Sequence, residues 1–222
     1  MHGLMPSLRQ LLAKHPTLLL IDSASARVQV GLWTKGEIEP PRWRTSDTEA
    51  GTGVFECVEA LLNESGLRIA KVSAFLFCEG PGSVLGIRTA AVALRSWRVI
   101  APAAATYAYQ SLDLVARSLN RPEVNVIADA RRDTWHVMRT GSSLQRVPSA
   151  ELHGELVMPE HFRHWTPLPA GLKTTRYDLP ELLAGLPDAD LFRSVTDPDA
   201  FTHEEPSYVT WTPQIHQASR PL

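Results

Sequence analysis

The sequence predicts an α/β protein in which one unit of strands and helices occurs twice. Residues 17–33 read as a strand, a short polar turn and a second strand, which is the pattern of a β-hairpin. About a hundred residues later, residues 123–138 show the same pattern, as an internal duplication does. Between the hairpins, an apolar run at 72–80 predicts a buried strand, and a helical pattern follows at 84–99. Together these observations predict two α/β subdomains.

The composition suits one large domain or two small ones. The chain has 222 residues, and its 22 basic side chains nearly balance 24 acidic ones. This balance argues against a broad basic field for nucleic acids, although a local basic patch is compatible with it. The two cysteines, Cys57 and Cys78, favour a reducing compartment, and the apolar run TLLLI is too short to span a membrane. We therefore expect a cytoplasmic protein that does not contact a membrane.

The spacing of apolar residues predicts the secondary-structure elements of the first half of the chain. Residues 1–16 are expected to be an N-terminal helical extension, because leucines recur at helical spacing over 6–15 until Pro16. The first α/β subdomain is expected at 17–103. In it, the hairpin is followed by a helix over 53–65, which ends at Gly66.

The second α/β subdomain is expected at 104–222, in a shortened form. It opens with a predicted helix over 111–119, and its hairpin carries Asp129 at the tip as the first hairpin carries Asp22. The region 141–200 is rich in proline.

The turn CEGPGSVLGIRTA, at 78–90, resembles a phosphate-binding loop but fits neither of two common templates. No lysine follows Gly86 as a Walker loop requires, and the third glycine of a dinucleotide fingerprint is displaced by one residue. Pro81 also removes one backbone N–H donor. The turn is better explained structurally. Gly80 and Gly82 permit a tight turn, Ser83 caps the helix, and Gly86 lets that helix approach a neighbouring element closely. Anion binding through Arg88 is the alternative.

The first hairpin tip suggests a third phosphate-binding template. Actin-like and sugar-kinase folds carry Asp-x-Gly-Thr at this point, where the glycine admits the nucleotide phosphates. Here the tip reads Asp22-Ser23-Ala24-Ser25, and the Ala24 methyl group would occupy the phosphate position. We therefore interpret Asp22, Ser23 and Ser25 as a vestigial phosphate hairpin and expect no cofactor.

Three motifs together resemble the TsaB family, also called YeaZ. They are LLLIDSASARVQVGLW, CEGPGSVLGIRTA and VIADARRDTWHV, and their order and spacing match the family's IDTS hairpin, GRGPGSFTGLR turn and IDARRGEVY hairpin. The likeness covers 17 to about 136, fades over 141–200 and returns near 206–209, PSYV. Val84-Leu85 replaces Phe-Thr of the family pattern.

The resemblance implies a duplicated actin-like ATPase fold (ASKHA, ribonuclease H-like) without catalytic activity. Members of the family are paralogues of TsaD, the ATPase that transfers threonylcarbamoyl to the adenosine beside the tRNA anticodon. They dimerise with TsaD and support it together with TsaE. The chain is thus expected to be a non-catalytic partner of a TsaD-like ATPase, with a TsaE-like ATPase in the same complex.

The residues themselves agree with the absence of catalysis. His161 and His164 could share a helix face, but only Glu160 is near enough in sequence to join them as a metal ligand. Ser83 lies in Gly-Pro-Gly-Ser and not in the Gly-x-Ser-x-Gly of a nucleophile elbow. We expect no catalytic or metal site. Three alternatives stay open: an actin-fold ATP-dependent phosphotransferase, a peptidase, and a homodimeric interaction module unrelated to tRNA.

The helix at 84–99 has two small or apolar faces, and a helix on a sheet needs only one. One face carries Ile87, Ala91 and Leu94. The other face, with side chains from the helix at 53–65, is predicted to be the partner interface or the surface of a homodimer: Phe55, Leu62, Gly86, Ala90, Ala93 and Trp97. The resemblance implies the same, because these helices form the dimer surface in the family.

The second hairpin tip is the other candidate contact. Arg131 and Arg132 stand there between Asp129 and Asp133. They are either a solvated, self-paired turn or a polar contact with a partner protein or a tRNA phosphate.

Overall fold

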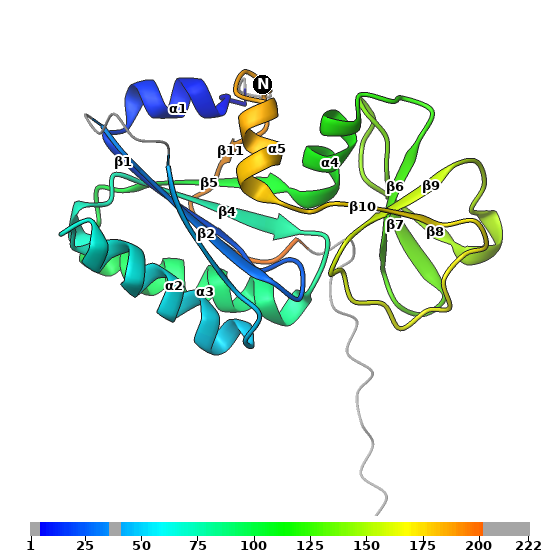
Figure 1. The fold of residues 1–222 in the computed structure, drawn as a ribbon, viewed down its shortest axis with the longest axis horizontal. Helices are drawn as coiled ribbons and strands as arrows, with labels where there is room; N and C mark the ends of the chain where they lie inside the picture. The colour runs from blue at the N-terminus through cyan, green and yellow to red at the C-terminus, as the bar shows by residue number, and fades with distance from the viewer. Residues whose placement is uncertain (1–4, 36–40, 202–222) are drawn as a thin grey trace, which may run out of the picture.

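The computed structural model describes residues 5–35 and 41–201, and in this part of the chain two β-sheets lie side by side (Figure 1). The first sheet has the strand order β11-β5-β4-β1-β2-β3 and the second has the order β10-β9-β6-β7-β8. The strands of the first sheet are β1 (Thr17–Asp22), β2 (Val28–Thr34), β3 (Arg42–Ser46), β4 (Ala74–Gly80), β5 (Ala105–Gln110) and β11 (Arg193–Ser194). Those of the second are β6 (Asn125–Asp129), β7 (Thr134–Met138), β8 (Gln145–Pro148), β9 (Leu156–Pro159) and β10 (Lys173–Thr175).

The predicted duplication is confirmed by the strand pairing. In the first sheet, β1 pairs antiparallel with β2 and parallel with β4, while β2 pairs with β3 and β4 with β5. In the second sheet, β6 pairs in the same way with β7 and β9, β7 with β8 and β9 with β10. Strands β6 to β10 therefore repeat the arrangement of β1 to β5.

The helices are distributed unevenly between the two units. Five α-helices are described: α1 (Leu8–Lys14), α2 (Ala50–Glu64), α3 (Val84–Ile100), α4 (Ser111–Leu119) and α5 (Leu179–Gly185). Short 3-10 helices lie at Ile69–Lys71 and Ser149–Glu151. In the second unit, the 3-10 turn at Ser149–Glu151 stands where α2 stands in the first, and the segment 160–172 stands where α3 does. The second unit thus has a short 3-10 turn and a non-helical segment in place of two α-helices.

The first sheet is buried on both faces. Helices α2 and α3 cover one face, and α1, α4 and α5 cover the other (Figure 1). Along β1, Leu18 and Leu20 belong to the core on the α4 side, and Leu19 and Ile21 belong to the core on the α2–α3 side. This explains why the strand is a continuous apolar run, since a strand covered on both faces has no polar side.

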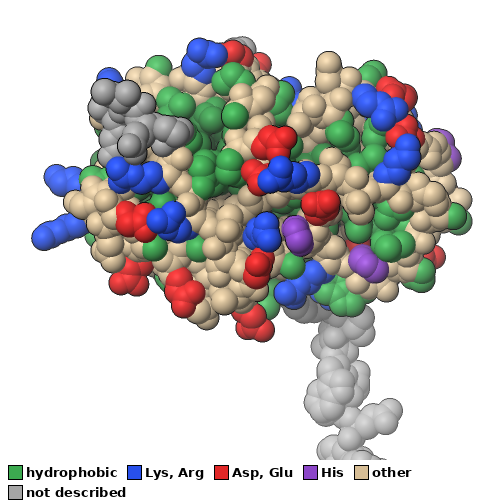
Figure 2. All heavy atoms as spheres, viewed as in Figure 1, with side chains coloured by type: hydrophobic (Ala, Val, Ile, Leu, Met, Phe, Trp, Pro, Cys, Tyr) green, Lys and Arg blue, Asp and Glu red, His purple; other side chains and the backbone are tan. Residues whose placement is uncertain are grey.

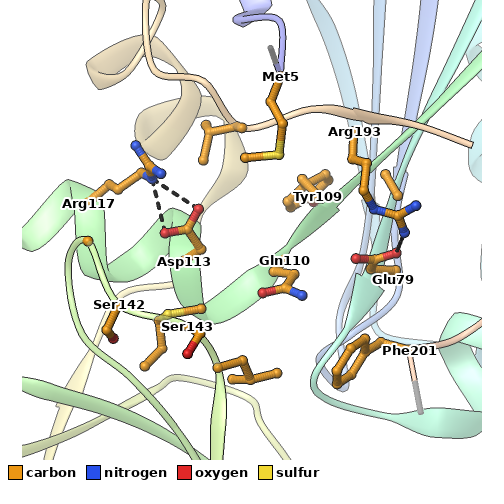
Figure 3. A pocket seen from close by; sticks show the side chains of 15 residues that line it. Met5, Glu79, Tyr109, Gln110, Asp113, Arg117, Ser142, Ser143, Arg193 and Phe201 are labelled. Atoms are coloured by element: carbon orange, nitrogen blue, oxygen red, sulfur yellow. Dashed lines mark hydrogen bonds and ion pairs between the residues drawn. The ribbon is translucent and has the colours of Figure 1, made fainter. Parts of the chain in front are cut away.

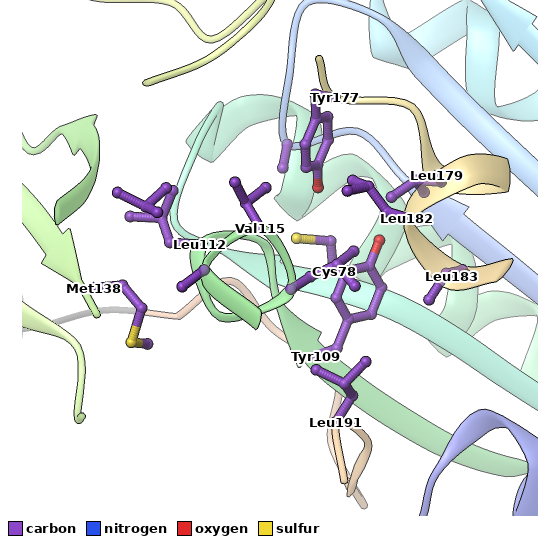
Figure 4. Packing of buried hydrophobic residues seen from close by; sticks show 14 of the residues in the cluster. Cys78, Tyr109, Leu112, Val115, Met138, Tyr177, Leu179, Leu182, Leu183 and Leu191 are labelled. Atoms are coloured by element: carbon purple, nitrogen blue, oxygen red, sulfur yellow. The ribbon is translucent and has the colours of Figure 1, made fainter. Parts of the chain in front are cut away.

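Helix α4 joins the two sheets into one core. Its buried side chains Leu112 and Val115 pack among residues of β4, β5 and α5 and of β7 in the second sheet (Figure 4). The boundary expected between residues 103 and 104 was placed too early, because β5 pairs with β4 in the first sheet. The chain also returns to this sheet through β11.

The predicted helices and strands otherwise agree closely with the structure. The N-terminal helix is present as α1, where Ser7 accepts a hydrogen bond from the Gln10 N–H in a capping box. Strands β3, β5 and β8 to β11 and helix α5 were not predicted from the sequence. Residues 1–4 and 202–222, including the PSYV motif, lie outside the described residues.

Candidate functional site: two hairpin tips and a helix pair

The carboxylate of Asp22 is a structural anchor inside the first subdomain. Its Oδ2 accepts hydrogen bonds from the hydroxyl groups of Tyr109 at 2.5 Å and Tyr177 at 2.7 Å, and its Oδ1 accepts one from the Ala24 N–H at 2.9 Å. Burial raises the pKa of Asp22, and these hydrogen bonds oppose the rise only in part. Both carboxylate oxygens are engaged in hydrogen bonds, so the carboxylate holds β1, β5 and the segment before α5 together.

Three backbone donors of the first tip, those of Ala24, Ala26 and Arg27, are bound within the chain. The Ala26 N–H donates to the His161 carbonyl at 2.7 Å, and the Arg27 N–H donates to Ser25 Oγ at 3.1 Å. Phosphate-binding tips leave such donors free for the ligand. With Ala24 N–H bound to Asp22 as well, the described tip offers no row of free donors. This supports the interpretation of the tip as vestigial; Asp22, Ser23 and Ser25 are all buried.

The Gly-Pro-Gly-Ser turn packs directly on this tip. The Ser83 N–H donates to the Ala24 carbonyl at 2.6 Å, and Ser83 Oγ caps α3 by accepting from the Gly86 N–H at 3.4 Å. A Cβ atom on Gly82 or Gly86 would overlap the carbonyl oxygen of Ala24 or Ser23, respectively. Gly82 and Gly86 therefore allow the backbone of the Gly-Pro-Gly-Ser turn and α3 to approach the backbone of the first hairpin tip closely. Arg88 is exposed on α3, and its anion-binding role stays a prediction.

We expect Gly86→Ala to destabilise the protein by about 1–3 kcal/mol, because the new methyl group must displace rigid backbone at the tip. Gly51→Ala is the matched control, since nothing lies within 4 Å of its added Cβ and alanine favours an exposed helix by up to about 1 kcal/mol. Urea unfolding of both variants measures the difference. Equal stability of the two variants would contradict the close approach.

The second hairpin tip is organised by another carboxylate, Asp129. Its Oδ1 accepts from the Arg131 N–H at 2.5 Å and from Thr166 Oγ1 at 3.2 Å. Its Oδ2 accepts from the backbone N–H groups of Trp165 and, at 2.8 Å, Thr166. Burial alone would raise the pKa of Asp129, but the backbone donors outweigh it and hold the pKa below its ordinary value.

The two arginines predicted as contacts lie at this tip in an unusual conformation. Arg131, Arg132 and Asp133 have φ values of +62°, +50° and +57°, a left-handed region that side chains other than glycine seldom adopt. Arg131 and Arg132 are exposed, and the Arg131 guanidinium carbon lies 4.2 Å from the ring centroid of Trp165. Trp165 was not singled out in the sequence, because its partner is distant along the chain.

The predicted partner interface on α3 is largely wrong. Leu62, Gly86, Ala90 and Ala93 are buried within the chain itself. The small residues do admit a neighbouring helix, but that neighbour is α2 of the same chain. At the outer edge of this seam, Phe55 stays 46% exposed and packs edge-on against Trp97, with 5.8 Å between ring centroids.

A different face of α3 is exposed and apolar. Leu85, Val92 and Val99 are 78%, 53% and 81% exposed. They stand seven residues apart, which puts them on one face of the helix. We call these three residues the α3 stripe. Because α3 already packs on the sheet and on α2, the stripe is its third face. Large apolar side chains exposed along one face of a helix indicate a candidate interaction surface.

A cavity of about 600 Å³ lies at the ends of β4 and β5 (Figure 3). Two ion pairs line it: Glu79 with Arg193 at 2.5 Å, and Asp113 with Arg117 at 2.9 Å. Gln110 lies between them in Figure 3. Burial raises the pKa of Asp113, although Arg117 opposes the rise. Since each carboxylate already faces its own arginine, the pairs give the cavity no net charge.

The histidine pair does not share a helix face. His161 lies in a turn with φ of +66°, and the segment through His164 is not helical. Among the described residues, no group of three or more His, Cys, Asp or Glu side chains is arranged to hold a metal ion. Nor does any described helix have the length and apolar character needed to cross a bilayer.

The duplicated strand order, with an aspartate at the tip of each first hairpin, defines the actin-like ATPase fold. No protein-family model matches the chain, and no curated protein matches it either. Several solved structures do match it. The chain is similar to YeaZ from Pseudomonas aeruginosa, with a TM-score of 0.57 and 21% identity over 77% of this chain and 89% of that one. A second structure, described as an uncharacterised protein with similarity to peptidase YeaZ from the same organism, gives a TM-score of 0.55 and 20% identity over 76% and 90%. At these identities the likeness shows that the chain has the fold of YeaZ.

Proposed function

We propose that the chain is a TsaB-like, non-catalytic partner of a TsaD-like ATPase in the threonylcarbamoyl modification of the adenosine beside the tRNA anticodon. The observation that carries the proposal is the combination of the YeaZ fold with a first hairpin tip in which the N–H groups of Ala24, Ala26 and Arg27 are bound within the chain, so that no row of free backbone donors faces a phosphate. A protein with this fold and no open phosphate cradle at that tip suits an accessory role better than an ATP-dependent one. The three family-like motifs found in the sequence support the same assignment.

The α3 stripe is the surface that we assign to the partner. A helix pair on the TsaD-like protein would bury the stripe together with Phe55, whose exposed ring lies on the neighbouring helix. Burying apolar area of this kind stabilises an association by roughly 25 cal/mol per Å² before entropic costs. A homodimer through the same face would compete with the partner.

We expect Val92→Arg to weaken partner binding by about 30-fold or more, because an apolar anchor is replaced by a charge that must be desolvated. The fold should survive, since Val92 is 53% exposed. Ala90→Arg, by contrast, should unfold the protein, because Ala90 is 1% exposed. Leu168→Arg is the matched control, an exposed apolar side chain outside α2 and α3. Size-exclusion chromatography with the partner and circular dichroism measure both properties. If Val92→Arg bound the partner with wild-type affinity, the α3 stripe would not be the partner-binding surface.

The proposed function is tested by reconstitution. A TsaD-like ATPase, a TsaE-like ATPase and unmodified tRNA are incubated with the threonylcarbamoyl donor, with and without the full chain. We expect modified adenosine to accumulate only when the chain is present. Unchanged modification in its absence would contradict the proposal.

A further inference from the structure

Trp165 is held as an exposed aromatic surface on the second subdomain. Its side chain is 60% exposed, although tryptophan is usually among the more buried residues. The guanidinium of Arg131 lies over its ring at 4.2 Å, which is within the range of a cation–π contact. We call the two side chains the Trp165–Arg131 pair.

Asp129 fixes both halves of this pair. The same carboxylate accepts from the backbone N–H of Arg131 and from that of Trp165, so it ties the β6–β7 tip to the segment 160–166. The left-handed conformation at 131–133 costs of order 1–3 kcal/mol for each residue. Strain of this kind persists where the surrounding structure over-determines it, and it clusters at binding sites. The pair is therefore pre-organised before any ligand arrives.

Three exposed arginines of the β6–β7 tip and of the segment 160–166 form no ion pair with a described carboxylate. Many arginines of the described chain are paired, as Arg9 is with Asp188 and Arg121 with Glu155. Arg131, Arg132 and Arg163 are exposed, and no ion pair joins them to a carboxylate of the described residues. His161 and His164 are exposed beside Arg163. The charge is local: Figure 2 shows basic and acidic side chains interspersed over the visible face.

We propose that the Trp165–Arg131 pair binds single-stranded RNA, with a base stacked on the pair and backbone phosphates on Arg132 and Arg163. Aromatic rings and arginine planes are stacking platforms for unpaired bases, whereas a duplex hides the base faces. Arg132 follows Arg131 at the tip and Arg163 precedes Trp165 by two residues, and these two exposed arginines would supply the phosphate contacts. The proposal deepens the proposed function, because it assigns the RNA-contacting surface of a tRNA-modifying complex. Val84 at the start of α3 lines the same small pocket as Trp165 and Arg131, so the RNA would lie beside the partner surface.

The test is fluorescence anisotropy of the full chain with a labelled single-stranded oligoadenylate RNA of about 12 nucleotides at low salt. Trp165→Ala should weaken binding by about 5- to 150-fold, and Trp165→Phe should retain most of the affinity. The fold should persist in Trp165→Ala, because the hydrogen bond to Asp129 comes from the backbone. Leu168→Ala is the matched control, an exposed apolar side chain of the same segment whose loss should leave binding unchanged.

The salt dependence tests the phosphate contacts separately. Each of Arg132→Ala and Arg163→Ala should reduce the slope of log affinity against log salt by about 0.7. A duplex RNA of equal length should bind more weakly than the single strand.

Failure of the RNA-binding proposal can be distinguished from failure of the proposed function, because different variants test the two. Val92→Arg should bind RNA normally while losing the TsaD-like partner, and Trp165→Ala should bind the partner normally while losing RNA. Absence of RNA binding by the wild-type chain, or binding by Trp165→Ala within twofold of wild type, would overturn the proposal. Loss of the partner in Trp165→Ala with RNA binding intact would overturn it as well and place Trp165 in the protein interface.

Discussion

Asp22→Ala is expected to lower the free energy of unfolding by at least about 3 kcal/mol. The substitution leaves the hydroxyl groups of Tyr109 and Tyr177 and the N–H of Ala24 without their acceptor in a fully buried site. Each unsatisfied buried donor costs about 1–3 kcal/mol, and whole domains are stable by only about 5–15 kcal/mol. For a chain of this size, the melting temperature should fall by at least about 6 °C.

Two milder variants identify the cause of this loss. Tyr177→Phe removes one donor together with its need for an acceptor, so it should cost much less than Asp22→Ala. Asp22→Asn keeps an acceptor for Ala24 and cannot ionise. Because burial raises the pKa of Asp22 in the folded protein, its stabilising contribution is complete below the unfolded pKa of about 3.9 and is lost as the pH rises through the folded pKa. The deficit of Asp22→Asn relative to the wild type should therefore shrink as the pH rises. A melting temperature of Asp22→Ala equal to that of the wild type would contradict the anchoring role.

Asp129→Asn is expected to destabilise the protein strongly although it preserves shape. One carboxylate oxygen accepts from the N–H groups of Trp165 and Thr166, and the other accepts from Arg131 and the Thr166 hydroxyl. An amide has a single acceptor oxygen, so its NH₂ group must face either the N–H groups of Trp165 and Thr166 or the Arg131 N–H and the Thr166 hydroxyl. Losing two hydrogen bonds to a charged acceptor costs about 3–6 kcal/mol. Asp129→Asn should also disorder the Trp165–Arg131 pair.

The pH dependence of this effect has the opposite sign to that of Asp22. The folded pKa of Asp129 lies below its ordinary value, so its stabilising contribution is present above the unfolded pKa of about 3.9 and is lost as the pH falls through the folded pKa. The stability gap between wild type and Asp129→Asn should narrow in acid. Thermal melting between neutral pH and about pH 3 measures it. If the stability difference between the wild type and Asp129→Asn stayed constant with pH, the charge of the Asp129 carboxylate would contribute nothing to the free energy of unfolding.

The hairpins and helix ends could be predicted because residues adjacent in the sequence determine them. Residues 17–33 place an apolar run and an alternating strand on either side of a polar tip, and Ser83 and Gly66 mark helix ends. The duplication was visible for the same reason, since both hairpins carry an aspartate at the same point. In the structure, each aspartate also accepts a hydrogen bond from the N–H two residues later, at Ala24 and Arg131.

The contacts of the site could not be predicted, because they depend on residues distant in sequence. Tyr177 lies 155 residues from Asp22 and Trp165 lies 36 residues from Asp129, and spacing gives no sign of either pairing. The α3 interface was mispredicted for a related reason. Small residues on a helix indicate a close neighbour, but they do not say whether that neighbour is another chain or, as here, α2.

We propose that the chain acts by binding a TsaD-like ATPase through the α3 stripe. The most direct measurement is affinity capture of the tagged full chain from cells of its own source, with quantitative mass spectrometry of the bound proteins. Wild type and the Leu168→Arg control should both enrich a TsaD-like ATPase, and Val92→Arg should lose it while remaining folded. Capture by the wild type without any TsaD-like protein, or equal capture by Val92→Arg, would contradict the claim.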